Sequence, residues 1–169
     1  MDEVPLLQVV PIVRALADHD VDYVMIGALA AALQGSPLRT NDADICPSRE
    51  PANLERLAAA LVDLDAKVYS TATPEGIRWA RDAVALSHAE IWNLISPYGR
   101  LDISYRPSGT EGYEDLVKRS VLLDVEGVPA RVASLHDVIR SKEAAGRQKD
   151  REQLPTLRKL LERLTEPNG

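Results

Sequence analysis

The segment from residue 22 to residue 46 constrains the fold of this 169-residue chain most strongly. It begins with the apolar run DYVMI, passes through Gly27 into the alanine-rich stretch GALAAALQG, and ends in NDADIC. The first run is rich in strand formers, and an alanine-rich stretch bounded by glycines is typical of a short helix. We therefore expect a strand, a tight turn, a helix and a second strand, which together indicate a mixed α/β domain.

The remaining elements follow from hydrophobic periodicity and turn residues. Helices are expected at 5–18, 51–63 and about 111–119, from Leu135 to a break or bend at Gly146, and over PTLRKLLERL. Strands are expected at 41–46, near 66–70, and as two hairpins at 84–95 with 100–105 and 120–125 with 128–132, while TATPEG reads as a polar loop. Ser134, followed three residues later by Asp137, resembles a capping box.

The predicted fold class is α/β of the α+β type, a mixed twisted sheet flanked by helices with a helical C-terminal segment. We expect an α/β core over 1–133 and a C-terminal helical segment over 134–169, packed together as one compact domain.

The charge and the cysteine content of the chain exclude some classes of protein. The single cysteine excludes an internal disulfide and a multi-cysteine zinc site. No apolar run reaches the length of a membrane span, and the N-terminus MDEVPLLQVV is acidic, so we expect a cytoplasmic protein without a membrane partner. The net charge of −6 argues against strong nucleic-acid binding. The stretch Leu135 to Leu164 is nevertheless basic, and it could hold phosphates or form a solvated helical surface.

Two carboxylates stand at the head of the second strand, where they would repel each other. On a strand, Asp42 and Asp44 point to one face while Ala43 and Ile45 point into the core. The α carbons of the two aspartates are then about 6.5 to 7 Å apart, which lets both carboxylates share a cation. A hard divalent ion such as Mg²⁺ would offset the repulsion. Most isolated Asp-x-Asp pairs, however, are turn or surface features.

A third aspartate stands in the same setting within GRLDISY. Asp102 takes the strand face opposite Leu101 and Ile103. If this strand neighbours the one carrying Asp42 and Asp44, the three carboxylates form a cluster that could bind a pair of metal ions for in-line attack at phosphorus. Such a cluster by itself also suits a metal-dependent phosphodiesterase.

Gly27 follows an apolar strand and opens a helix. A glycine turn at this point offers free backbone N–H groups to a phosphate. A simple strand-to-helix turn is the alternative, and the candidate metal site fifteen residues later favours the phosphate-binding interpretation.

The stretch IGALAAALQGSPLRTNDADI resembles the signature of the polymerase-β-like nucleotidyltransferase superfamily. Its part GSPLRTNDAD, together with the later SLHDVIRSKEAAGRQKD, is similar to the minimal nucleotidyltransferases of type IV toxin–antitoxin systems, the AbiEii-like and MenT-like toxins. The resemblance runs from about residue 5 to residue 163. It implies the mixed sheet of the nucleotidyltransferase fold.

The resemblance also implies roles for the acidic and glycine motifs. Asp42, Asp44 and Asp102 would be the catalytic metal-binding triad, with Mg²⁺ as the cofactor and Mn²⁺ as the alternative ion. Gly27 and Ala28 would form the triphosphate-binding turn. Ala28 stands where the family usually has Gly or Ser, so a serine hydroxyl contact to phosphate is missing.

Four further residues take roles from the same resemblance. Lys142, with Arg39 and Arg147, would neutralise the charge that develops on the leaving pyrophosphate, which is an electrostatic role for cations. Asp150 matches the aspartate that closes the C-terminal motif, and it would orient Lys142 or Arg147.

The resulting hypothesis is a Mg²⁺-dependent nucleotidyltransferase that moves a nucleotide monophosphate from an NTP, such as ATP, to an acceptor hydroxyl. The 3′ end of tRNA or another RNA is the favoured acceptor, and a protein hydroxyl or a small molecule is the alternative. The chain would then be a tRNA-modifying toxin with a cognate antitoxin. A catalytically weak module of the same fold that binds a nucleotide or a partner, and a phosphodiesterase, are the competing hypotheses.

Overall fold

The structure is a computed structural model that describes residues 3–167. In this part of the chain the helices are α1 (Val9–Asp18), α2 (Gly27–Leu33), α3 (Pro51–Asp63), α4 (Ala83–Ser87), α5 (Tyr113–Leu116), α6 (Leu135–Ala145) and α7 (Gln148–Thr165), with a 3-10 helix at Val117–Arg119. The strands are β1 (Tyr23–Ile26), β2 (Asp42–Pro47), β3 (Lys67–Ser70), β4 (Thr73–Ile77), β5 (Ile91–Ser96), β6 (Gly99–Ser104), β7 (Val121–Val125) and β8 (Val128–Val132).

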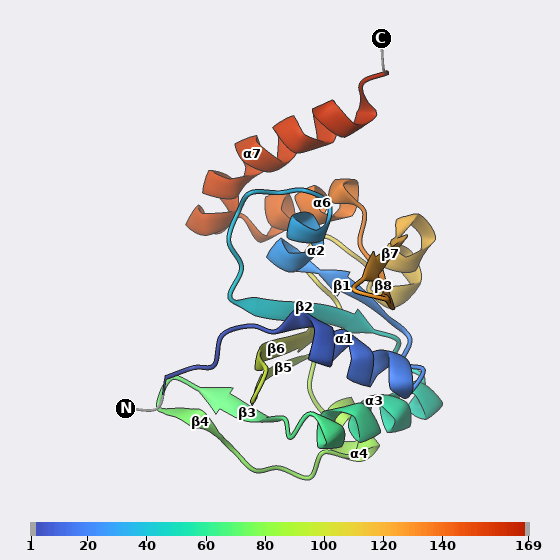
Figure 1. Cartoon of the computed structure of the whole chain (residues 1–169), viewed down its shortest axis with the longest axis vertical. Helices are drawn as coiled ribbons and strands as arrows, with labels where there is room; N and C mark the ends of the chain where they lie inside the picture. Colours follow the sequence, from blue (N-terminus) through green and yellow to red (C-terminus); the bar gives the residue numbers. More distant parts are fainter. Residues whose placement is uncertain (1–2, 168–169) are drawn as a thin grey trace.

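All these strands belong to one mixed sheet in the order β4-β3-β5-β6-β2-β1-β8-β7. The pairs β1–β8 and β2–β6 are parallel, and the other neighbours are antiparallel. In Figure 1, α2, α6 and α7 lie above β2, whereas α1, α3 and α4 lie below it. This arrangement confirms the predicted fold class, a mixed sheet flanked by helices with a helical C-terminal segment.

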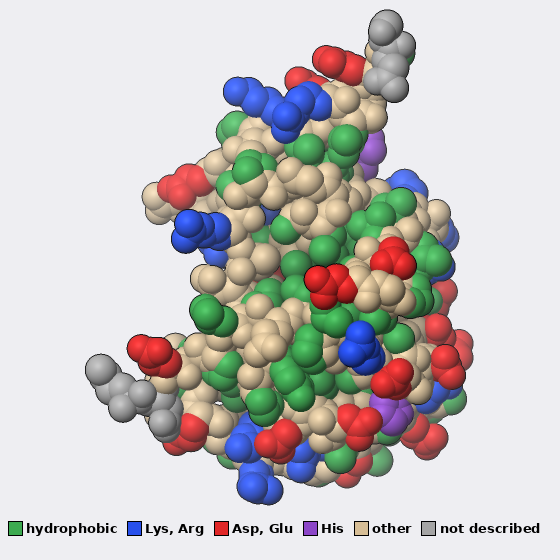
Figure 2. All heavy atoms as spheres, viewed as in Figure 1, with side chains coloured by type: hydrophobic (Ala, Val, Ile, Leu, Met, Phe, Trp, Pro, Cys, Tyr) green, Lys and Arg blue, Asp and Glu red, His purple; other side chains and the backbone are tan. Residues whose placement is uncertain are grey.

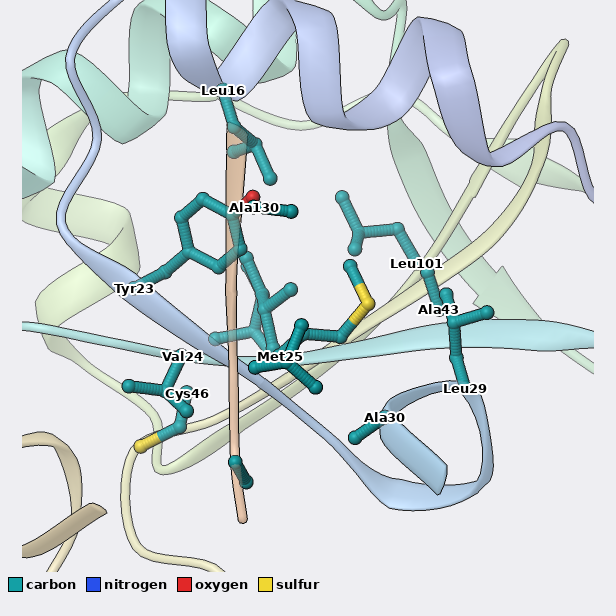
Figure 3. Close-up of a cluster of buried hydrophobic side chains, with 14 of the residues drawn as sticks. Leu16, Tyr23, Val24, Met25, Leu29, Ala30, Ala43, Cys46, Leu101 and Ala130 are labelled. Atoms are coloured by element: carbon teal, nitrogen blue, oxygen red, sulfur yellow. The ribbon is translucent and has the colours of Figure 1, made fainter. Parts of the chain in front are cut away.

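The central strands alternate between two different environments. On the side of α1, Tyr23 and Met25 of β1 pack with Leu16 and with Ala43 of β2, as Figure 3 shows. Leu16, Met25 and Ala43 have no exposed surface. The alternation follows from the two-residue period of a strand. The opposite face of β2 and β6 therefore receives the polar residues of both strands.

Several local predictions are confirmed. Pro51 begins α3, and the strands at 23–26, 67–70, 121–125 and 128–132 lie where the sequence indicates. Ser134 caps α6 by accepting a hydrogen bond from the backbone N–H of Asp137 at 3.2 Å, and Gly146 ends that helix in the left-handed conformation with φ of 62°. The proposed boundary between 133 and 134 stays a prediction, and the outermost residues of the two ranges, 1–2 and 168–169, lie outside the described part.

The expectation of a loop at TATPEG is wrong, because Thr73–Ile77 forms the edge strand β4. This strand pairs with β3 through Val68 opposite Ile77. Gly76 allows the close packing, since a Cβ there would lie 2.5 Å from the Cβ of Lys67. Pro74 is tolerated because an edge strand has backbone N–H groups that need no partner strand.

The expected strand from residue 84 is also wrong in its first part. Ala83–Ser87 forms the short helix α4, and β5 begins only at Ile91. Asp82 starts this helix, because its side chain accepts a hydrogen bond from the backbone N–H of Ala85 at 2.8 Å. The apolar run alone does not separate a buried helix from a buried strand.

Two predicted helices have different starting points in the structure. The first begins at Val9 rather than at residue 5. The last begins at Gln148 and contains Pro155 inside it, whereas PTLRKLLERL alone suggests a start at the proline. The earlier start is stabilised by Asp150, whose carboxylate accepts hydrogen bonds from the backbone N–H of Arg147 at 3.3 Å and from its side-chain Nε at 2.7 Å.

The surface shows both signs of charge over the C-terminal helices. In Figure 2, Lys and Arg side chains lie at the top of the molecule next to Asp and Glu side chains, rather than as a patch of one sign. Both signs of charge are therefore exposed on this face of the molecule. Within residues 3–167, no helix combines the length and the apolar character needed to cross a membrane.

Candidate functional site

The three strand-borne aspartates meet on one face of the sheet. β2 and β6 are parallel neighbours, and their register sets Asp44 opposite Asp102 and Asp42 opposite Arg100. One carboxylate oxygen from each of Asp42, Asp44 and Asp102 lies within 4.8 Å of the others. The predicted adjacency of these strands is therefore confirmed. In the described residues, no other group of three or more His, Cys, Asp or Glu side chains comes together in this way.

Burial makes two members of this cluster, Asp44 and Asp102, harder to ionise. Together with the charges of Asp42 and Asp102, it raises the pKa of Asp44 to about 7. Burial also raises the pKa of Asp102 to about 6, although Arg100 acts in the opposite direction. The cause is that a carboxylate removed from water and facing like charges favours its neutral form.

Arg100 is a functional candidate that the sequence analysis missed. Its Nη2 donates to Oδ1 of Asp102 at 2.8 Å, and its guanidinium carbon lies 3.9 Å from the ring centroid of Tyr69. The ring and the carboxylate together fix this cation beside the acidic cluster. Its position two residues before Asp102, on the same strand face, was the signal available in the sequence.

The residues of the cluster fit a divalent cation. Carboxylate oxygens are the ligands that Mg²⁺ and Mn²⁺ prefer. Three of them converge, and burial with the neighbouring carboxylates raises the pKa of two of them, Asp44 and Asp102. A cation held by Asp42, Asp44 and Asp102 would relieve this repulsion.

Gly27 adjoins the cluster through a close approach. Its φ is +68°, and a Cβ added at this position would lie 2.4 Å from Oδ2 of Asp44. Only glycine combines that conformation with that proximity. Gly27 and Ala28 both line the cleft that contains the aspartates. The sequence-predicted turn and the acidic motif therefore belong to one site.

The C-terminal helices contribute cations to the same cleft. Nζ of Lys142 donates to Oε1 of Gln153 at 2.8 Å and to Oδ1 of Asp150 at 3.4 Å. The side chain of Lys142 is only 12% exposed, whereas that of Arg147 is 76% exposed. Arg147 Nε donates to Oδ2 of Asp150 at 2.7 Å. Lys142 is thus held in place by two partners.

Asp150 is buried at the junction of α6 and α7. Burial alone would raise its pKa, but the hydrogen bond from Arg147 and the charges of Arg147 and Lys142 bring the pKa below its ordinary value. Asp150 therefore carries a negative charge that faces two cations. Its contacts match the expected orienting role toward Lys142 and Arg147, although that role itself stays a prediction.

The cleft has a volume of about 610 Å³. Of the predicted site residues, it brings together Gly27, Ala28, Asp42, Asp44, Asp102, Lys142, Arg147 and Asp150. Arg39 is exposed and is not among the lining residues. Asn93 and Gln153 also line the cleft, although neither belongs to a sequence motif named above. Gln153 lies three residues after Asp150 on one helix, which was the available signal.

No protein-family model matches the chain, and no curated protein matches it. Solved structures do match. A Thermotoga maritima protein assigned to the nucleotidyltransferases is 22% identical, with a TM-score of 0.51, over 90% of this chain and 89% of its own. The lincosamide antibiotic adenylyltransferase LnuA, bound to lincomycin, is 15% identical, with a TM-score of 0.58, over 88% of this chain and 93% of its own.

A third match is the antibiotic-resistance factor ANT(2″)-Ia in complex with adenylyl-2″-tobramycin. It is 14% identical, with a TM-score of 0.58, over 90% of this chain and 87% of its own. At these identities the likeness concerns the fold. The chain has the nucleotidyltransferase fold, as the sequence resemblance implied.

Proposed function

We propose that this protein is a nucleotidyltransferase that moves a nucleotide monophosphate from an NTP to an acceptor hydroxyl. The observation that carries the proposal is the convergence of Asp42, Asp44 and Asp102 in one cleft with the Gly27 turn and the partly buried cation Lys142. A phosphodiesterase would need the acidic cluster, but it would leave the glycine turn and the held lysine without a role. The fold shared with adenylyltransferases supports the same choice.

Asp42, Asp44 and Asp102 would hold the divalent cation, for which we propose Mg²⁺, with Mn²⁺ as the alternative. When bound, such an ion supplies positive charge that lets the triphosphate and an acceptor oxygen approach the carboxylates. The backbone N–H groups of Gly27 and Ala28 would face the triphosphate, because both residues line the cleft beside Asp44.

In the transfer step, the acceptor hydroxyl oxygen forms a bond to the α-phosphorus. The bond between that phosphorus and the oxygen bridging to the β-phosphorus breaks, pyrophosphate leaves, and the hydroxyl proton passes to water. Lys142 stabilises the charge that gathers on pyrophosphate, and Asp150 and Gln153 keep its ammonium group in position. The exposed Arg147 adds a second cation. Arg39 has less support, since it does not line the cleft.

For the acceptor we propose an RNA 3′ end, with tRNA favoured. This choice depends on the resemblance of GSPLRTNDAD and SLHDVIRSKEAAGRQKD to toxin nucleotidyltransferases. The protein would then act in the cytoplasm as a toxin opposed by a cognate antitoxin. A small-molecule hydroxyl is the second candidate acceptor. The net charge of −6 favours it, as does the fold shared with an antibiotic adenylyltransferase and an antibiotic-resistance factor.

The decisive experiment supplies each of four α-labelled NTPs with Mg²⁺ to total cellular RNA, total protein and a small-molecule extract. We expect label in one discrete product with the native chain. The double variant Asp42→Ala/Asp44→Ala should give no label, whereas Glu55→Ala, which changes an exposed carboxylate on α3, should label normally.

Two other outcomes would favour a different function. Product formed from RNA without any NTP would indicate a phosphodiesterase. The absence of label, together with a melting temperature that still rises with NTP and Mg²⁺, would favour a binding module. In that case Ala28→Ser is the first variant to make, because it restores the hydroxyl that the resemblance leads one to expect.

A further inference from the structure

Asp137 on α6 is a buried carboxylate of which only one oxygen is paired. Its side chain is 1% exposed. Oδ1 accepts a hydrogen bond from Nη2 of Arg119 at 2.5 Å and lies 3.1 Å from Nη2 of Arg140. Oδ2 is buried and has no hydrogen-bond partner among the described residues. A buried carboxylate oxygen without a hydrogen-bond donor is unfavourable. A bound ligand could supply the missing donor to Oδ2.

The surroundings of Asp137 indicate what kind of group would supply that donor. Asp137 lines the same cleft as the acidic cluster, and Leu116, Ala133 and Val138 line it too. All three are buried apolar residues. Apolar lining together with a fixed, buried acceptor suits a flat ring that carries a hydrogen-bond donor on its edge.

Asp137 and Lys142 lie on the same helix and line the same cleft. They are five positions apart on α6, which is about 7.5 Å along a helix axis. Because Lys142 is proposed to face the phosphates and both residues line one cleft, the group that reaches Asp137 would be another part of the nucleotide.

We propose that Oδ2 of Asp137 accepts a hydrogen bond from the exocyclic amino group of the nucleobase, so that the protein selects an amino-bearing NTP over UTP. This inference depends on the proposed function. Since Oδ1 is occupied by two arginines, one oxygen remains for one donor. Uracil offers only N3–H, flanked by two carbonyl oxygens that would repel the carboxylate.

The first test uses the native chain and changes only the ligand. Binding of each NTP with Mg²⁺ and without acceptor is measured by calorimetry. The tightest NTP should be ATP, CTP or GTP. Its partner lacking the amino group, namely purine riboside triphosphate, UTP or ITP, should bind roughly tenfold more weakly or worse.

Two variants connect this preference to Asp137. Asp137→Asn keeps the shape of the side chain and the acceptor oxygen for the arginines, and it puts an amide N–H₂ in place of Oδ2. The preference should vanish or reverse toward UTP. Asp115→Asn is the matched control, because Asp115 also pairs with Arg140, at 2.9 Å, but is not among the cleft-lining residues. It should keep the native preference.

The possible results distinguish a failure of the base-recognition proposal from a failure of the proposed transferase function. Equal binding of an NTP and its partner lacking the amino group would overturn the inference and leave the transferase proposal standing. Binding of no NTP at all would overturn both. A preference that persists unchanged in a folded Asp137→Asn would assign base recognition to another residue and overturn the role of Asp137.

Discussion

Some residues of the cleft are in conformations or environments that lower the stability of the folded protein. Asp44 is the clearest example, because burial and two neighbouring carboxylates raise its pKa to about 7 from an ordinary value of 3.8. Gly27 is the second, because it holds a positive φ in direct proximity to Asp44. Strained backbone and uncompensated charges are common at binding sites, where a bound ligand offsets their unfavourable energy.

The raised pKa of Asp44 predicts that Asp44→Asn stabilises the metal-free protein. A carboxyl group whose pKa is higher in the folded than in the unfolded state contributes its full stability below about pH 3.8. That contribution is lost as the pH rises through about 7. Asparagine has no charge to bury, so the variant should melt several degrees higher at pH 8 in EDTA, with a gain that shrinks toward pH 4.

Thermal melts at pH 4, 6 and 8 with excess EDTA measure this effect. Glu55→Gln, at an exposed position on α3, is the control and should melt like the native chain at each pH. A lower melting temperature for Asp44→Asn at pH 8 would contradict the assigned environment of Asp44.

Gly27→Ala should damage both stability and the acidic cluster. The added Cβ would lie 2.4 Å from Oδ2 of Asp44 at a φ of +68°. We expect a loss of roughly 1 to 2 kcal/mol in unfolding free energy, together with a reduced response to Mg²⁺. Gly127→Ala is the matched control, because Gly127 has a φ of +87° and a Cβ added there would meet nothing within 4 Å.

Urea unfolding of the two alanine variants, with and without Mg²⁺, distinguishes the effect of backbone strain from that of the steric overlap with Asp44. Both should lose stability through backbone strain. If Gly127→Ala also lost the response to Mg²⁺, or if Gly27→Ala kept it in full, the close contact with Asp44 would have no functional meaning.

At the scale of elements, the junction of α6 and α7 depends on one buried ion network. Asp150 accepts from Lys142 and from Arg147, and it caps the start of α7 through the backbone N–H of Arg147. Removing one member of a buried ion pair leaves the other charge uncompensated, which is far more costly than losing a surface pair.

We therefore expect Asp150→Ala to lower the unfolding free energy by about 2 to 4 kcal/mol. Glu143→Ala removes the exposed ion pair with Arg158, which also joins α6 to α7, and should cost less than about 1 kcal/mol. Urea denaturation of both variants tests the difference. Equal losses would indicate that Asp150 acts as an ordinary surface charge.

Sequence patterns were sufficient to predict the bounds of some helices and strands but not of others. The helix over 51–63 has a proline at its first position and apolar residues at helical spacing, and the structure has the same bounds. Strand β4 and helix α4 were missed because their formation depends on Gly76 packing against Lys67 and on the cap from Asp82. Both are specific contacts that periodicity does not report.

At the scale of the whole molecule, ligand binding should stabilise the fold by mass action. A cation bound by Asp42, Asp44 and Asp102 in the folded state alone would add about 2.7 kcal/mol at a concentration about one hundred times its dissociation constant. We expect Mg²⁺ or Mn²⁺ to raise the melting temperature, and EDTA to reverse the rise.

The matched measurement is the double variant Asp42→Ala/Asp44→Ala, which should show no rise with either ion. Calcium and zinc chloride at the same concentrations test for selectivity. A rise that survives in the double variant would indicate that the cation binds elsewhere in the molecule.

The sequence by itself determined the local features of this protein. The alternation of Asp42 and Asp44 with apolar neighbours, the glycine turn and the capped helix at Leu135 all follow from interactions over a few residues, and the structure has them. The candidate acidic residues could be named for the same reason, because a carboxylate in a strand that is otherwise apolar is visible without knowing the fold.

Only the tertiary structure decided which of these features meet. The parallel pairing of β2 with β6 brings Asp102 to Asp44 and adds Arg100 to the cluster, and the docking of α6 lets Lys142 line the same cleft. Arg39 shows the converse, because it lies only three residues before Asp42 in the chain and yet does not line the cleft. The physical reason is that strand pairing and helix docking depend on the burial of apolar faces over the whole molecule, which no short stretch of sequence contains.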